Sequence, residues 1–147
     1  MKTINKNIYL RLLSRIFIKV NIMADKEKTI EALQAIVTGL SANSFQHRIQ
    51  SKIFAGLGFQ ALGDKYTTHA TEELDFVEQF MDRILDLGGD LKQEAQEAKP
   101  VFNDIVEFIE YDYNVSVEGI AFINELMESG IFDANTYDLI KVYLKDE

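Results

Sequence analysis

The sequence lacks several of the residues and motifs on which common protein chemistries depend. Its 147 residues include no cysteine, no tryptophan and a single proline. Without cysteine the chain can form no disulfide bond, thiolate zinc site or cysteine nucleophile. No Gly-rich phosphate loop, Ser-His-Asp arrangement or nucleophile elbow occurs either. These absences exclude the usual signatures of nucleotide binding and hydrolysis, and nothing indicates an oxidising compartment, so we expect a cytoplasmic protein.

Basic residues are scarce once the first 22 positions are set aside. Those positions contain no acidic residue and five basic ones: Lys2, Lys6, Arg11, Arg15 and Lys19. The rest of the chain has 10 basic and 24 acidic residues, a net charge of −14. A surface of this kind repels phosphate backbones, so nucleic-acid binding is not expected. Metal ions are the expected partners.

Residues 1–22 form a basic N-terminal extension of the main domain, residues 23–147. Apolar residues between Ile8 and Val20 alternate with charges, which is typical of an amphipathic presequence. The charges interrupt the apolar run too often for a membrane-spanning helix. We consider three alternatives: synthesis that starts at Met23, surface anchoring, and an arm that contacts other subunits. No membrane contact is expected for residues 23–147.

The spacing of apolar residues predicts an all-α fold of four helices in an antiparallel bundle. The predicted segments are residues 26–55, 59–87, 100–129 and 134–147. Pro100 suits the first turn of the third helix, and Asp133 is a suitable N-cap for the fourth. The fourth segment is about half as long as the others, so we expect an incomplete wall that further chain or a partner covers.

Four acidic or imidazole side chains are predicted on the inward faces of these helices: Glu73, Asp112, Glu147 and His47. Burying an unpaired carboxylate costs several kcal/mol unless the carboxylate is paired or binds a metal. Carboxylates and imidazoles that converge from several helices are what a non-haem iron or manganese site requires. Taken together, the four residues therefore form a candidate metal site.

Each of these residues also has a simpler interpretation when it is taken alone. An inward histidine such as His47 is commonly a hydrogen-bonded core residue. Asp112 can pair with Arg48 or Arg83, or turn toward solvent. Glu147 can be solvated, because it is the last residue.

Residues 56–89, GLGFQALGDKYTTHATEELDFVEQFMDRILDLGG, resemble the region between the first and second helices of bacterioferritin-like proteins in the ferritin-like superfamily. HATEE and RILDLGG are the most specific parts. Weaker similarity continues through EYDYNVSVEGI (110–120) and TYDLIKVYLKDE (136–147), so the resemblance covers about residues 28–147. It implies a ferritin-like four-helix bundle with an incomplete fourth helix.

Proteins of this kind bind two irons through a glutamate, a Glu-x-x-His, a glutamate and a second Glu-x-x-His on successive helices. By the resemblance, Glu73 and Glu147 keep two of these positions. Leu40, Phe76 and Ser116 stand in place of a glutamate, a histidine and a glutamate. The resemblance therefore implies a degenerate di-iron site, and we do not expect ferroxidase activity.

Two further positions bear on cofactors. Leu74 stands where bacterioferritins carry the haem-binding methionine, so no haem is implied. His47 falls where the family often has a tyrosine, and together with Glu73 and Asp112 it forms a candidate site for one weakly held ion.

Two functions follow. The first is a homo-oligomeric iron-binding or iron-storage subunit whose acidic residues handle iron. The second is a non-catalytic scaffold or interaction subunit that binds no metal, which is favoured by Phe76 inside the bundle because an aromatic ring stabilises a core and does not bind metal. An oxidoreductase that uses another metal is a third alternative.

Overall fold

The computed structural model describes the backbone of residues 6–96 and 98–146, and side chains from residue 25 onward within those ranges. Four α-helices and no strand occur in this part of the chain. The helices are α1 (Lys6–Gly56), α2 (Gln60–Asp86), α3 (Ile105–Glu128) and α4 (Ala134–Asp146). The predicted all-α fold of four helices is confirmed, and α4 is the shortest.

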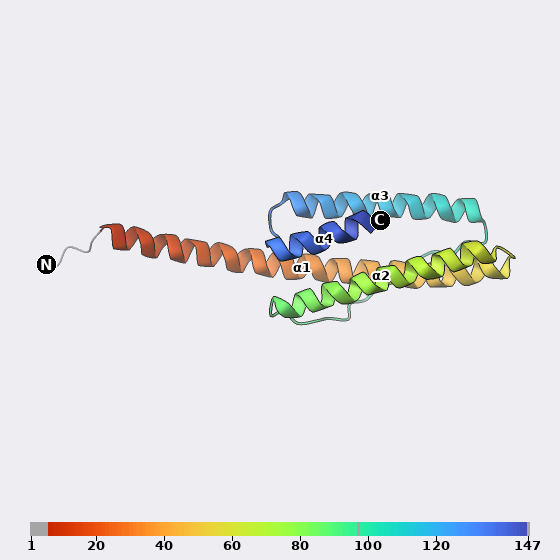
Figure 1. Ribbon diagram of the computed structural model, residues 1–147, viewed down its shortest axis with the longest axis horizontal. Helices are drawn as coiled ribbons and strands as arrows, with labels where there is room; N and C mark the ends of the chain where they lie inside the picture. The colour runs from red at the N-terminus through yellow and green to blue at the C-terminus, as the bar shows by residue number, and fades with distance from the viewer. Residues whose placement is uncertain (1–5, 97, 147) are drawn as a thin grey trace.

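The four helices form a bundle (Figure 1). A tight turn reverses the chain between α1 and α2. The connection across residues 87–104 then runs back along the bundle, so that α3 runs in the same direction as α2 (Figure 1). α4 returns alongside α3 and ends about halfway along it (Figure 1).

The first helix is much longer than predicted. It begins at Lys6, whereas the apolar pattern placed its start near Lys26. No glycine or proline lies between these residues, so nothing in the local sequence breaks the helix. The N-terminal part of α1 projects beyond the other helices (Figure 1). In the part of the chain that the structure describes, no helix is both long enough and apolar enough to cross a membrane.

The third helix begins later than predicted, at Ile105 and not at Pro100. The side chain of Asp104 caps it by accepting hydrogen bonds from the backbone N–H groups of Val106 and Glu107, at 2.8 and 3.0 Å. The Pro100 carbonyl accepts a hydrogen bond from a side chain of α1 and lies outside the helix. The aspartate cap, and not the proline, therefore sets the start of α3.

Three buried glutamines of α1 hold the long connection against the bundle. The Gln34 side-chain amide donates to the Lys92 carbonyl at 3.0 Å and accepts from the Lys92 N–H at 3.2 Å. Gln50 forms the same pair of hydrogen bonds with Phe102. Gln46 donates to the Pro100 carbonyl at 2.7 Å. These amides satisfy backbone groups that the connection cannot satisfy for itself.

Replacing Gln50 by leucine is expected to lower the free energy of unfolding by about 2 kcal/mol, because it leaves the N–H and C=O of the half-buried Phe102 without their partners. Urea denaturation followed by circular dichroism measures this change. Gln79→Leu is the matched control, since Gln79 lies on the exposed face of α2. Equal effects of the two substitutions would contradict the role assigned to Gln50.

An apolar core fills the part of the bundle that α4 covers. Its buried members are Leu33, Ile36, Val37, Leu40, Phe76, Val77, Phe80, Ile84, Ile123, Ile140 and Tyr143. The ring of Tyr143 packs edge-on against Phe76 and Phe80, with centroid distances of 5.2 and 5.7 Å. Arg83 donates to Thr136 and Asp133 at 2.9 and 2.7 Å and so holds the start of α4.

A glycine brings α1 and α2 close together. A Cβ atom added to Gly63 would lie 2.7 Å from the Ser51 carbonyl oxygen and 3.2 Å from the Ala55 Cβ. Farther along the same pair of helices, Ser44 donates to the Ala70 carbonyl at 2.7 Å. The close packing at Gly63 therefore helps to fix how the inward side chains of α2 meet those of α1.

Candidate metal centre

A polar cluster lies in the bundle interior, around His47 of α1. His47 is buried, with its side chain 4% exposed. Its Nδ1 atom lies 2.7 Å from Glu73 Oε2 on α2, and its Nε2 atom lies 2.8 Å from Asp112 Oδ1 on α3. Three helices thus bring together three of the four residues that the sequence nominated. The fourth, Glu147, lies outside the described residues.

Helical spacing explains why these side chains meet. Tyr66, His69 and Glu73 follow one another on α2 at steps of three and four residues, so they share the face that points at α1. On α3, Asp112 lies one turn after the fully buried Phe108 and shares its inward face. The cluster therefore results from ordinary helix periodicity on three packed helices.

No arginine among the described side chains pairs with Asp112. Its Oδ2 atom accepts a hydrogen bond from the Tyr66 hydroxyl at 3.1 Å, so both carboxylate oxygens have partners. Arg48 instead donates to Thr71, and Arg83 binds the start of α4. The alternative in which Asp112 pairs with Arg48 or Arg83 is therefore wrong.

The charges in this cluster compensate one another. Burial alone would lower the pKa of His47, but the hydrogen bonds to Asp112 and Glu73 and their negative charges raise it to about 9. Burial likewise opposes ionisation of Asp112, but the hydrogen bond with His47, the positive charge of His47 and the hydrogen bond from Tyr66 together lower the pKa of that carboxyl. His47 is therefore an imidazolium between two carboxylates at neutral pH.

Tyr66 is kept protonated in the same environment. Burial, followed by the charge of Asp112 and the hydrogen bond to it, raises the pKa of the Tyr66 phenol above its ordinary value. The phenol consequently remains a hydrogen-bond donor and fixes the Asp112 carboxylate.

His69 adds a second imidazole. One ligand atom from each of His47, His69 and Glu73 can be chosen so that all three lie within 4.8 Å of one another. The two histidine rings are 4.9 Å apart between centroids, and His69 is half-buried. The sequence analysis did not include His69 among the candidate site residues. Its position four residues before Glu73 is the signal that could have identified it.

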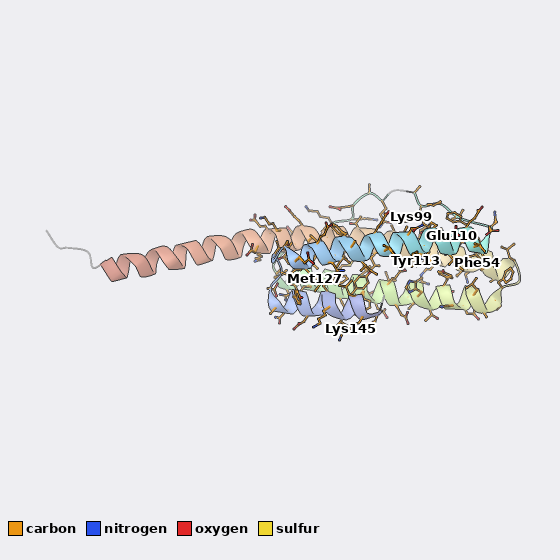
Figure 2. All side chains as sticks on the ribbon, turned by 90° about the horizontal axis from the view of Figure 1, so that it is seen from above. Phe54, Lys99, Glu110, Tyr113, Met127 and Lys145 are labelled. Atoms are coloured by element: carbon orange, nitrogen blue, oxygen red, sulfur yellow. The ribbon has the colours of Figure 1, made fainter. Side chains whose placement is uncertain are left out.

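Aromatic rings and a pocket both border the cluster. Phe108 packs edge-on to His47 at a centroid distance of 6.1 Å and to Phe54 at 5.6 Å. A pocket of about 480 Å³ also borders the cluster and is lined by Lys65, Tyr66, Thr68, His69, Glu72 and Asp112. The bundle continues beyond the last turn of α4, the turn that carries Lys145 (Figure 2). Phe54 and Tyr113 lie in this part of the bundle.

Leu40, Phe76 and Ser116 occupy the positions at which the resemblance implies lost metal ligands. Leu40 and Phe76 are buried in the apolar core, where Phe76 packs against Tyr143. Neither carries an atom that binds metal. Ser116 is half-buried on α3. Side chains of this kind do not fit a carboxylate-bridged pair of irons, because leucine and phenylalanine supply hydrocarbon where such a pair needs charge.

Comparison with known proteins agrees with the bundle architecture. A search of curated proteins finds no match. The sequence model of the ferritin-like domain family matches residues 30–147, which include all of α2, α3 and α4 and the part of α1 that carries His47. The chain therefore belongs to the ferritin-like domain family.

Proposed function

We propose that this chain is an iron-handling subunit of the ferritin-like family that binds one divalent cation at the His47 cluster. The observation that carries the proposal is the convergence of ligand atoms from His47, His69 and Glu73 within 4.8 Å. Two of these three side chains are buried, so their ligand atoms are held in place before an ion arrives. The net charge of −14 beyond residue 22 attracts cations to the molecule.

A single ion fits these residues better than two. A di-iron centre with the family's ligand set would need ligand atoms where Leu40 and Phe76 pack against the apolar core. Iron oxidation at such a centre is therefore not part of the proposal. If the chain stores iron, acidic surface residues of a homo-oligomeric shell would hold it.

A cation would take the place of a proton at His47. Nδ1 faces Glu73 at 2.7 Å, and an imidazole nitrogen must be deprotonated to bind metal. Nε2 would keep its hydrogen bond to Asp112 if an ion occupied the Nδ1 side. In this arrangement Nδ1 of His47 would bind the ion, and Nε2 would donate to the Asp112 carboxylate.

One observation favours the second function, a scaffold that binds no metal. Both ring nitrogens of His47 already have carboxylate partners, so the cluster is satisfied without an ion. In that case Glu73, His47 and Asp112 link three helices as a buried ionic network, and the chain serves as a subunit in mixed or homo-oligomeric assembly.

Elemental analysis coupled to native mass spectrometry separates the two functions. After anaerobic loading with Fe²⁺ and desalting, we expect the full chain to retain one ion per subunit. Glu73→Gln should lose that ion. The matched control is Glu78→Gln, an exposed glutamate on the same helix, which should keep it.

Retention of no ion by the folded wild-type chain would favour the scaffold. Two ions per chain, both lost in Glu73→Gln, would overturn the single site. Storage has its own test: under air, assembled protein should hold more iron than an equally acidic control protein of another fold.

A further inference from the structure

We propose that the ion is held by two histidines and one carboxylate, His47, His69 and Glu73, with Asp112 as a positioning residue and with free coordination positions facing the adjacent pocket. The inference rests on the proposed function and specifies its site. Its consequence is a preference for Fe²⁺, Co²⁺ and Zn²⁺ over Mg²⁺ and Ca²⁺, and access of small ligands to the bound ion.

The donor set points to this class of metal. Mg²⁺ and Ca²⁺ are bound almost entirely by oxygen atoms, whereas imidazole suits Fe²⁺, Co²⁺ and Zn²⁺. Two of the three converging side chains here are imidazoles. His69 and Glu73 come from one face of α2, and His47 comes from α1, so the three donors approach the ion from two helices. A set of two histidines and one carboxylate with open positions is typical of a single iron site.

Asp112 has the position of a residue that orients a ligand. Histidines that bind metals commonly donate their other ring N–H to a carboxylate, which fixes the ring and strengthens the metal-binding nitrogen. Asp112 Oδ1 lies 2.8 Å from His47 Nε2, the nitrogen remote from Glu73. Asp112 is not a member of the group whose ligand atoms lie within 4.8 Å. Tyr66 holds the second oxygen of Asp112, so the carboxylate cannot easily turn toward the ion.

Access comes from the side of His69. Three protein donors leave at least one position vacant on a four- to six-coordinate ion. His69 and Asp112 both line the pocket of about 480 Å³, which is large enough for several water molecules. Lys65 lines the same pocket and supplies a hydrogen-bond donor for water or a small anion. Phe108 packs edge-on against the His47 ring and does not line this pocket.

Co²⁺ binding to the metal-free full chain, followed by visible spectroscopy, tests the inference. We expect one Co²⁺ per chain, no displacement by millimolar Mg²⁺ or Ca²⁺, and a change in the visible bands when azide is added. His69→Ala should weaken binding at least about tenfold. Asp112→Asn should keep the 1:1 stoichiometry, weaken binding about 10- to 100-fold and shift the bands. Asp75→Asn, an exposed carboxylate on α2, is the matched control and should bind as wild type does.

The outcomes separate this inference from the broader function. If the folded wild-type chain binds no Co²⁺, Zn²⁺ or Fe²⁺, the proposed function itself fails. If metal binds but His69→Ala has wild-type affinity, or Mg²⁺ competes equally, the two-histidine set is wrong. An unchanged spectrum with azide overturns the open position. Wild-type affinity and spectrum in Asp112→Asn remove its positioning role, provided that circular dichroism reports the same helix content.

Discussion

Replacing His47 by leucine is expected to lower the free energy of unfolding of the metal-free chain by about 3–5 kcal/mol. The substitution removes the positive partner of Glu73, a carboxylate that is 3% exposed, and of Asp112. A buried charge left without its partner is strongly destabilising. Urea denaturation of the chelator-treated protein, followed by circular dichroism, measures the loss.

A second substitution identifies the cause. The double variant His47→Leu/Glu73→Leu also removes the buried Glu73 carboxylate, which has no partner in His47→Leu. The double variant should therefore recover most of the lost free energy of unfolding. His69→Leu is the control, because His69 contacts the His47 ring but no hydrogen bond is found for its side chain in the described structure. We expect that control to cost no more than about 1 kcal/mol. If the double variant is no more stable than His47→Leu, loss of packing and not the unpaired charge explains the effect.

Phe80→Ala is expected to lower the free energy of unfolding by about 3–5 kcal/mol, the usual cost of emptying a fully buried aromatic position. Phe80 is 0% exposed and packs against Phe76 and Tyr143. Phe45→Ala makes the same chemical change at a residue of α1 that is 66% exposed, and it should cost less than about 1 kcal/mol. Both variants can be measured by urea denaturation under the same conditions.

Hydrogen exchange adds a local measurement to this comparison. Because Tyr143 is one of three buried residues that attach α4 to the bundle, loss of Phe80 should speed amide exchange in α4 more than in α2. Uniform acceleration along the chain would contradict a specific attachment of α4 through this ring.

Helix boundaries could be predicted where a residue marks them strongly. Gly88 adopts a positive φ of 73° directly after α2, and the observed helix ends within one residue of the prediction. Asp133 accepts hydrogen bonds from the backbone N–H groups of Asn135 and Thr136, as its predicted N-cap role requires. The start of α3 was missed because Pro100 and Asp104 are both good starting signals. Hydrogen bonds from Gln46 and Gln50 of α1 hold Pro100 and Phe102 in the connection, so that α3 begins after Asp104.

The site could be predicted only in part. Periodicity alone puts His47, Glu73 and Asp112 on inward faces, and the structure brings the three together. Periodicity does not fix how far apart helices lie or how they are rotated about their axes. For that reason it could not exclude an arginine partner for Asp112, nor identify the hydroxyl of Tyr66 as its second partner.

Gly63 has no side chain, and this affects the His47 cluster farther along α2. Any substituent there would press on the Ser51 carbonyl and force the two helix axes apart at that end of the bundle. Such a separation would lengthen the hydrogen bond between His47 Nδ1 and Glu73 Oε2, which are 2.7 Å apart. Because Gly63 has no side chain, α1 and α2 can pack closely at this point. The proposed metal site therefore depends in part on the absence of a side chain at this position.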